Sequence, residues 1–211
     1  MISHATVLAK AAILGDGGRL RISVALLAIP FAASAQRTDA TEWLTATAGY
    51  GQRVAVYGVG AMWHLPWGEE MLARHGLDAR IGIDVLRWEG PALSNATSSA
   101  AADRFLWNGN VTPYLRWHPA DGVWRNAFIE FGVGVQVLSG TSISSTADYQ
   151  RNFGSTLQFG ERLAAGVSFG PHGRYEIAPF VQHVSNARIK LPNDGLTYFG
   201  VTIRLALDPV P

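Results

Sequence analysis

The sequence predicts an all-β fold, an eight-stranded antiparallel transmembrane β-barrel. Apolar and polar residues alternate with period two in segment after segment along the chain. Eight such segments can be counted, and most are about ten to fifteen residues long, which suits tilted membrane strands better than globular ones. The polar faces carry glycine, glutamine and balanced charges, whereas a water-exposed face would be rich in lysine and glutamate.

The alternation is clearest in 126–137, where Ile129, Phe131 and Val133 lie on one face and Glu130 and Gln136 on the other. Segments 77–88, 155–169 and 196–207 repeat this pattern, and four further segments show it less regularly. In chain order, the predicted strands are 42–50, 53–64, 77–88, 105–118, 126–137, 155–169, 174–186 and 196–207.

The odd face of most strands is apolar and is predicted to meet lipid, while the charged side chains pair across a narrow lumen. The predicted lumen charges are Asp78, Arg80, Asp84, Glu130, Arg162, Glu176 and Arg204. Aromatic residues near strand ends are predicted to form interfacial girdles. These are Trp63, Trp67, Trp88, Trp107, Trp117, Trp124 and Tyr198. An exported, soluble lipocalin-like barrel is the alternative fold.

Both termini of an even-stranded barrel lie on one side, which is taken as the periplasmic side. The connections 51–52, 89–104, 139–154 and 187–195 then lie outside the cell. The connections 65–75, 119–125 and 170–173 lie in the periplasm. Most of the long connections therefore fall outside, as is typical of outer-membrane barrels.

The N-terminus reads as an export signal. Residues 22–33 are apolar, follow Arg19 and Arg21, and end at the small-x-small site Ala33-Ser34-Ala35. The stretch is short for a spanning helix, and Pro30 interrupts it. We therefore predict a signal peptide at 1–35 and a barrel domain at 36–211.

Composition excludes several classes of protein. With 17 basic and 16 acidic residues, the chain lacks the positive charge of a nucleic-acid binder. It has no cysteine, which excludes disulfides, thiolate metal sites and cysteine nucleophiles. The four histidines beside predicted turns have no carboxylate pair at metal spacing, so neither a metal nor a cofactor is implied. They are His64, His75, His118 and His172.

His183 and Ser185 share one face of the strand predicted at 174–186. Residues two apart on a strand point the same way, with Cα atoms roughly 6.5–7 Å apart. Imidazole beside hydroxyl is the minimum for an activated serine nucleophile. Interfacial polar residues near the lipid headgroups are the alternative interpretation, although polar groups on a lipid face need a reason.

The run Phe180-Val-Gln-His183-Val-Ser185-Asn186-Ala187-Arg-Ile-Lys190-Leu-Pro192-Asn193-Asp194-Gly195 resembles the outer-membrane lipid A 3-O-deacylases (PagL-like). The stretch from Phe159 to Gly170 is similar to the sixth strand of that family. The resemblance is strongest over about the last sixty residues. It implies an eight-stranded barrel that hydrolyses the ester-linked 3-hydroxyacyl chain at position 3 of lipid A. By the same resemblance Ser185 is the nucleophile and His183 the general base. Asn186 and Asn193 are candidates for positioning or oxyanion stabilisation.

The sequence departs from this family at Thr197, where the family has the glutamate of its catalytic triad. A threonine hydroxyl can accept from the imidazole N–H but cannot stabilise an imidazolium with charge. Glu161 and Asp194 are the candidates for a substitute acid, and three readings stay open: a slow deacylase, one with a recruited acid, or an inactive barrel.

The leading hypothesis is therefore a multi-pass protein of the outer membrane. It acts as an ester hydrolase on lipid A of lipopolysaccharide in the outer leaflet. The resemblance also suggests a homodimer, and no nucleic-acid partner is expected. A catalytically inactive barrel with a structural or surface-interaction role is the second hypothesis. A soluble periplasmic lipid carrier is the third.

Overall fold

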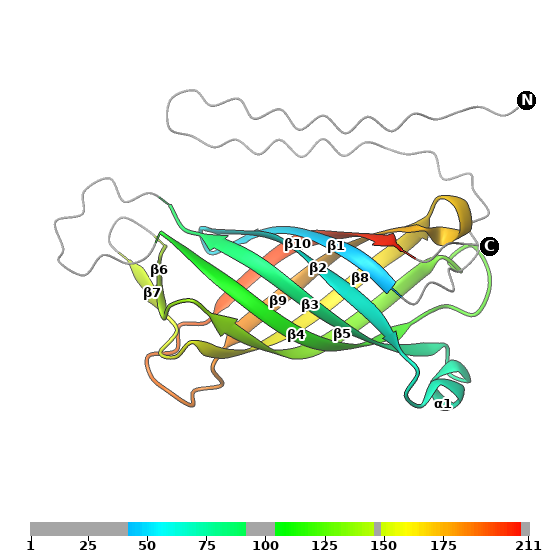
Figure 1. Cartoon of the computed structure of the whole chain (residues 1–211), viewed down its shortest axis with the longest axis horizontal. Coiled ribbons are helices and arrows are strands. Elements are labelled where there is room, and N and C mark those ends of the chain that lie inside the picture. Colours follow the sequence, from blue (N-terminus) through cyan, green and yellow to red (C-terminus); the bar gives the residue numbers. More distant parts are fainter. Residues whose placement is uncertain (1–41, 92–103, 146–148, 208–211) are drawn as a thin grey trace, which may run out of the picture. The chain divides into compact units, whose positions relative to one another are not determined.

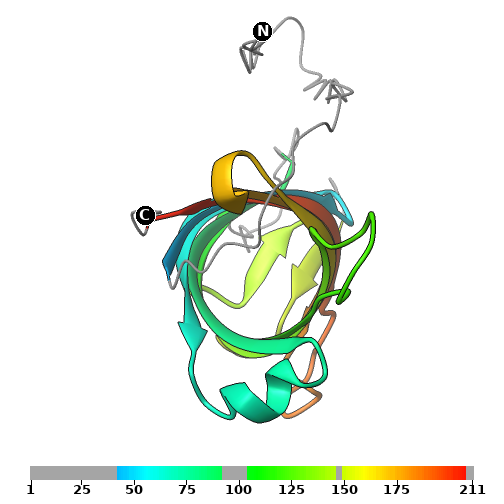
Figure 2. The same cartoon turned by 90° about the vertical axis from the view of Figure 1, so that its right-hand side faces the viewer.

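The computed structural model describes residues 42–91, 104–145 and 149–207. Eight strands close into one antiparallel barrel, in which β1 pairs with both β2 and β10 (Figures 1 and 2). They are β1 (Glu42–Gly51), β2 (Val54–Leu65), β3 (Leu77–Glu89), β4 (Phe105–Trp117), β5 (Ala127–Leu138), β8 (Leu157–Phe169), β9 (Tyr175–Ser185) and β10 (Leu196–Ala206). The fold class is confirmed, and each predicted strand is found within two residues of its observed bounds. The predicted signal peptide at 1–35 lies outside the described residues.

Four short elements lie in the connections. The hairpin of β6 (Ser142–Ser144) and β7 (Gln150–Asn152) lies at one end of the barrel, here called the outer end. The helix α1 (Glu69–Ala73) and the 3-10 turn η1 (Pro171–Gly173) lie at the other end (Figure 1). The described part of the chain contains no helix that is both long and apolar enough to cross a bilayer.

The barrel is inverted relative to a soluble protein, because its outer wall is apolar and its interior is ionic. Exposed side chains such as Phe131, Val133 and Val135 alternate along β5 with fully buried Glu130 and Gln136. This pattern excludes the soluble lipocalin-like alternative, because water would face a continuous apolar wall.

Two glutamates and two arginines form the centre of the interior. Arg116 Nη1 donates to Glu176 Oε1 at 2.7 Å and Arg116 Nη2 to Glu130 Oε2 at 2.7 Å. Arg204 donates to the same two carboxylates, at 3.1 Å to Glu176 and 2.6 Å to Glu130. Each charge is thus paired twice, which offsets the cost of burying it. The predicted pairing of charges across the lumen is therefore observed, and it ties β4, β5, β9 and β10 together.

The prediction of an interfacial girdle is wrong for two of the aromatic residues. Trp88 and Tyr198 occupy inward positions of their strands and are 0% exposed. Together with Phe153 they form part of an apolar cluster inside the barrel, with Trp88 5.6 Å from Phe153 and 6.2 Å from Tyr198 between ring centroids. The parity of each position, rather than its nearness to a strand end, decides which way the side chain points.

The remaining girdle residues face outward or lie in the connections. Trp107 and Trp117 are exposed on β4, Trp63 is half-buried on β2, and Trp67 and Trp124 are exposed in turns. The position of His118 beside a turn predicts a solvated side chain, but this residue is only 7% exposed and its Nε2 lies 2.8 Å from Asp78 Oδ2.

Candidate active site on the barrel wall

His183 lies in the middle of a row of three outward-facing polar side chains. In the register of the sheet it is directly opposite Glu161 of β8 on one side and Thr197 of β10 on the other. Directly opposite residues on neighbouring strands have Cβ atoms about 4.5–5.5 Å apart. Glu161 and His183 are exposed and Thr197 is half-buried. The closed sheet therefore gathers, on a wall that is otherwise apolar, three residues that are far apart in sequence.

The imidazole of His183 contacts Thr197. His183 Nδ1 lies 2.8 Å from Thr197 Oγ1, a distance at which the hydroxyl can accept from Nδ1–H. That tautomer leaves the lone pair on Nε2, where a general base needs it. The backbone N–H of Thr197 donates to Gln52 Oε1 at 3.0 Å, so the β1–β2 turn also touches the site.

Ser185 lies two residues after His183 on the same face of β9, at the outer end of the strand. It is half-buried and is opposite Phe159 of β8 in the register. The two side chains therefore point the same way, one strand repeat apart, as the sequence predicts.

Gly195 lies against the far edge of the imidazole. A Cβ built at this residue would be 3.1 Å from His183 Cε1 and 3.5 Å from Nε2. The backbone of Gly195 also has a positive φ of 57°, a conformation that costs other residues free energy. Both the backbone conformation and the close approach to the histidine therefore favour glycine at this position.

The loop that carries Gly195 is braced by the β6–β7 hairpin. Arg151 of β7 donates from Nη1 to the carbonyl oxygens of Asp194, at 3.1 Å, and Gly195, at 2.5 Å. Arg151 is buried, so these hydrogen bonds are shielded from water. The hairpin therefore holds the loop whose glycine contacts the imidazole.

Asp194 points toward the hairpin. Its Oδ2 accepts from the backbone N–H of Asn152 at 2.7 Å, and its own N–H donates to the carbonyl of Asn152 at 3.0 Å. Tyr149 also hydrogen-bonds to this carboxylate, and partial burial followed by that hydrogen bond raises the pKa of the phenol. The carboxylate of Asp194 is thus engaged in the loop, whereas Glu161 is opposite His183.

Asn186 and Asn193 hold the same loop together. The Asn186 amide donates from Nδ2 to the carbonyls of Phe153, at 2.8 Å, and Lys190, at 2.6 Å. The Asn186 backbone N–H donates to Asn193 Oδ1 at 3.1 Å. Because both amide protons of Asn186 have partners, this geometry favours a positioning role for its side chain over donation to an oxyanion.

Three residues at this site were not singled out from the sequence. Gln52 and Arg151 come from connections remote from the motif, and no sequence signal links them to it. The role of Gly195 against the imidazole is likewise visible only in the fold. Across 42–91, 104–145 and 149–207, no group of three or more histidine, aspartate or glutamate side chains is arranged to hold a metal ion.

The sequence model of the lipid A 3-O-deacylase (PagL) family matches residues 55–206, which is most of the chain. The chain belongs to this family. The site residues from Glu161 to Thr197 all lie inside the matched segment. Family membership and the apolar wall together place the barrel in the outer membrane.

Two curated members of the lipid A 3-O-deacylase family are similar to part of the chain. The lipid A deacylase PagL of Bordetella bronchiseptica is 32% identical over 97 residues, which cover 46% of this chain and 48% of the relative. The lipid A deacylase PagL of Pseudomonas aeruginosa is 35% identical over 80 residues, 38% of this chain and 42% of the relative. Each match thus spans less than half the length of the relative.

The crystal structure of the outer membrane enzyme PagL is also similar in fold. It superposes with a TM-score of 0.60 at 24% identity, and the alignment covers 80% of this chain and 99% of that chain. The likeness extends over nearly the whole barrel of this family member.

Proposed function

We propose that the protein is a serine-type lipid A 3-O-deacylase that hydrolyses the ester-linked 3-hydroxyacyl chain at position 3 of lipid A. The observation that carries the proposal is the hydrogen bond of 2.8 Å between His183 Nδ1 and Thr197 Oγ1, on the face that Ser185 shares. With the hydroxyl accepting from Nδ1–H, the lone pair lies on Nε2, as a serine hydrolase needs, at the outer end of a lipid-facing wall.

The reaction runs in two halves. Ser185 Oγ attacks the ester carbonyl and gives its proton to His183 Nε2. The tetrahedral intermediate then expels the sugar oxygen, which takes that proton and leaves an acyl-enzyme. In the second half, water attacks the acyl-enzyme with His183 as base, which releases the 3-hydroxy fatty acid and restores Ser185. Throughout, Thr197 holds Nδ1–H in place.

Glu161 is the acid that we assign to the site. In both halves of the reaction His183 becomes an imidazolium, which needs a nearby negative charge. Thr197 supplies a hydrogen-bond acceptor but no charge, while Glu161 faces His183 from the neighbouring strand. Asp194, the other candidate, binds Asn152 and Tyr149. In this proposal Thr197, as a neutral acceptor, and Glu161, as a separate carboxylate, together replace the single glutamate of the family.

Asn186 and Asn193 are assigned as positioning residues. Their hydrogen bonds close the loop 186–195 against the carbonyl of Phe153 and so support Gly195 beside the imidazole. We expect their loss to act through the orientation of His183 rather than through direct contact with the substrate.

A catalytically inactive barrel is the second candidate function, and threonine in place of the triad glutamate is the observation that favours it. Mass spectrometry of lipid A from cells expressing the wild type or Ser185→Ala separates the two. A deacylase removes one 3-hydroxyacyl chain with the wild type alone. Unchanged lipid A with both proteins, each shown by heat-modifiable gel migration to be folded, would refute the hydrolase and leave the inactive barrel.

A further inference from the structure

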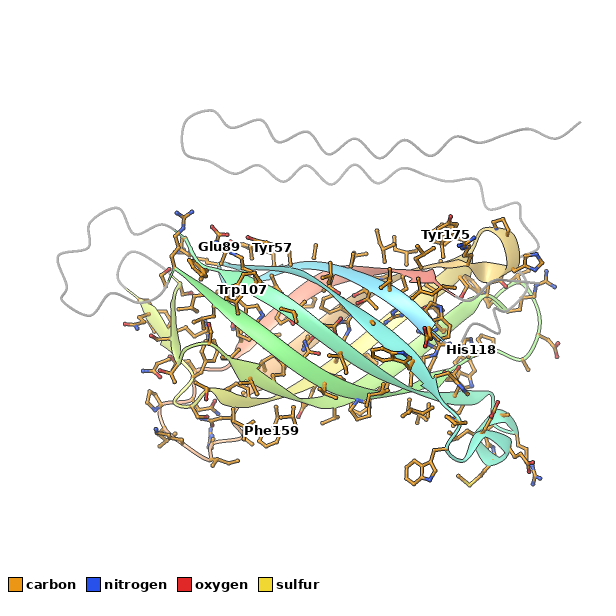
Figure 3. The ribbon with its side chains drawn as sticks, in the orientation of Figure 1. Tyr57, Glu89, Trp107, His118, Phe159 and Tyr175 are labelled. Carbon is orange, nitrogen blue, oxygen red and sulfur yellow. The ribbon has the colours of Figure 1, made fainter. Side chains whose placement is uncertain are left out.

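A second polar patch occupies the outer wall on the far side of the barrel. Going round the ring, β3 lies four strands from β9 in either direction. At the outer end of β3 the outward side chains are Arg87 and Glu89, and the register places Tyr57 of β2 and Trp107 of β4 on either side of Arg87. Figure 3 shows Tyr57, Glu89 and Trp107 at the end of the barrel where Phe159, the register partner of Ser185, also lies.

The patch carries two guanidinium groups and one carboxylate. Arg104, which precedes β4, donates from Nη2 to Glu89 Oε1 at 3.1 Å, and Tyr57 donates from its hydroxyl to Glu89 Oε2 at 2.8 Å. Arg87 Nε lies 3.6 Å from Glu89 Oε2, too far for a hydrogen bond. One negative charge thus faces two positive charges, and the patch has a net positive charge on a wall that meets lipid.

Arg87 is held in place by aromatic rings. Its guanidinium carbon lies 4.2 Å from the centroid of Phe105 and 5.9 Å from that of Trp107. Among the described residues, its Nε is buried and has no hydrogen-bond partner. An arginine fixed over aromatic faces in this way is arranged to present its remaining N–H groups to a planar or tetrahedral anion.

Below the patch the same strands are apolar. Val85 and Ile83 of β3 and Val59 of β2 are among the exposed side chains of the wall. A basic cluster above an apolar surface, at the level of the headgroups, complements an amphiphile with an anionic head. A free anion would make no contact with the apolar surface below the cluster, whereas the acyl chains of a lipid would.

We propose that this patch binds the phosphate of a lipid A molecule in the outer leaflet and does not hydrolyse that molecule. The residues that form it are Arg87, Arg104, Tyr57, Phe105 and Trp107. Arg87 and Arg104 contact the phosphate oxygens, and the aromatic rings contact the sugar and the upper acyl chain. The site is separate from Ser185 and does not depend on catalysis there.

The test counts lipids bound to the purified full-length protein in detergent by native mass spectrometry. The protein carries Ser185→Ala to prevent turnover, and the probes are bisphosphorylated lipid A, chemically dephosphorylated lipid A and inorganic phosphate. We expect two bound molecules of bisphosphorylated lipid A. With Arg87→Gln and Arg104→Gln together, the dissociation constant of one of them should rise by about tenfold or more, because charge-assisted hydrogen bonds are lost.

Arg125→Gln is the matched control, because it removes an exposed arginine at the opposite end of the barrel. Arg104→Gln alone changes an exposed residue outside the strands, so it tests the site even if the double variant does not fold. Equal binding by the variants and the control would overturn the proposal. So would equal binding of dephosphorylated lipid A, or a bound inorganic phosphate that does not compete with the lipid.

Discussion

Replacing Thr197 with valine removes the hydroxyl that lies 2.8 Å from His183 Nδ1 and leaves a side chain of nearly the same shape. The backbone N–H of Thr197, which donates to Gln52, is untouched by this change. Activity should therefore fall because the imidazole loses its acceptor, while the barrel itself should keep its fold.

The size of the effect follows from the kind of hydrogen bond that is lost. In the transition state the donor is an imidazolium, and a hydrogen bond to a charged group contributes about 1.5–3 kcal/mol. At about 1.4 kcal/mol per factor of ten, kcat/KM should fall by about 10- to 150-fold. This is well below the loss of about 10⁴ seen when a triad carboxylate is removed, because the threonine is neutral.

The assay follows release of the 3-hydroxy fatty acid from lipid A in mixed micelles, with Thr197→Ser as the matched control. Serine keeps the hydroxyl, so Thr197→Ser should retain most of the activity. If Thr197→Val were as active as the wild type, or if both variants lost activity equally, the hydroxyl would not orient His183 and the reasoning would fail.

Four further changes test the site and the barrel. Thr197→Glu supplies a carboxylate at the position of the family glutamate and should raise turnover of lipid A; a lower rate would contradict the assignment of position 197 to the catalytic site. Glu161→Gln should lower kcat by about tenfold through loss of its charge, whereas Asp194→Asn should leave the chemical step alone, and the reverse order would exchange their roles. Gly195→Ala should leave heat-modifiable migration intact and reduce turnover by at least about tenfold, because its Cβ presses on the imidazole; wild-type rates would show that the close approach is unimportant. Glu176→Gln should lower the free energy of unfolding by about 3–5 kcal/mol in urea titrations, since it leaves buried arginines undercompensated, and an unchanged midpoint and slope would refute the role of this ion cluster.

Period-two alternation, together with strand length and the composition of the polar faces, predicted the barrel. Each predicted strand agrees with an observed one, because one face had to be apolar for lipid and the other polar for a closed interior. Along β5, for example, a shift of one residue would place Glu130 in lipid and Val133 in the ion-paired core. Such a shift would cost a large amount of free energy, so the pattern determines which face of each strand points toward lipid. The same parity, applied to Trp88 and Tyr198, would have placed them inside, where they are found.

The motif around His183 and Ser185 could also be read from the sequence, since both residues lie on one strand and share its parity. What the sequence could not decide was the partner of His183. Glu161 and Thr197 reach it only through the pairing of β9 with β8 and β10, and Asp194, the nearer candidate in sequence, is bound to Asn152. Hydrogen bonds between strands and loops depend on closure of the whole barrel, which a local pattern does not contain. Sequence alone thus predicted the fold and the proposed nucleophile–base pair, whereas only the tertiary structure decided which residues surround the imidazole.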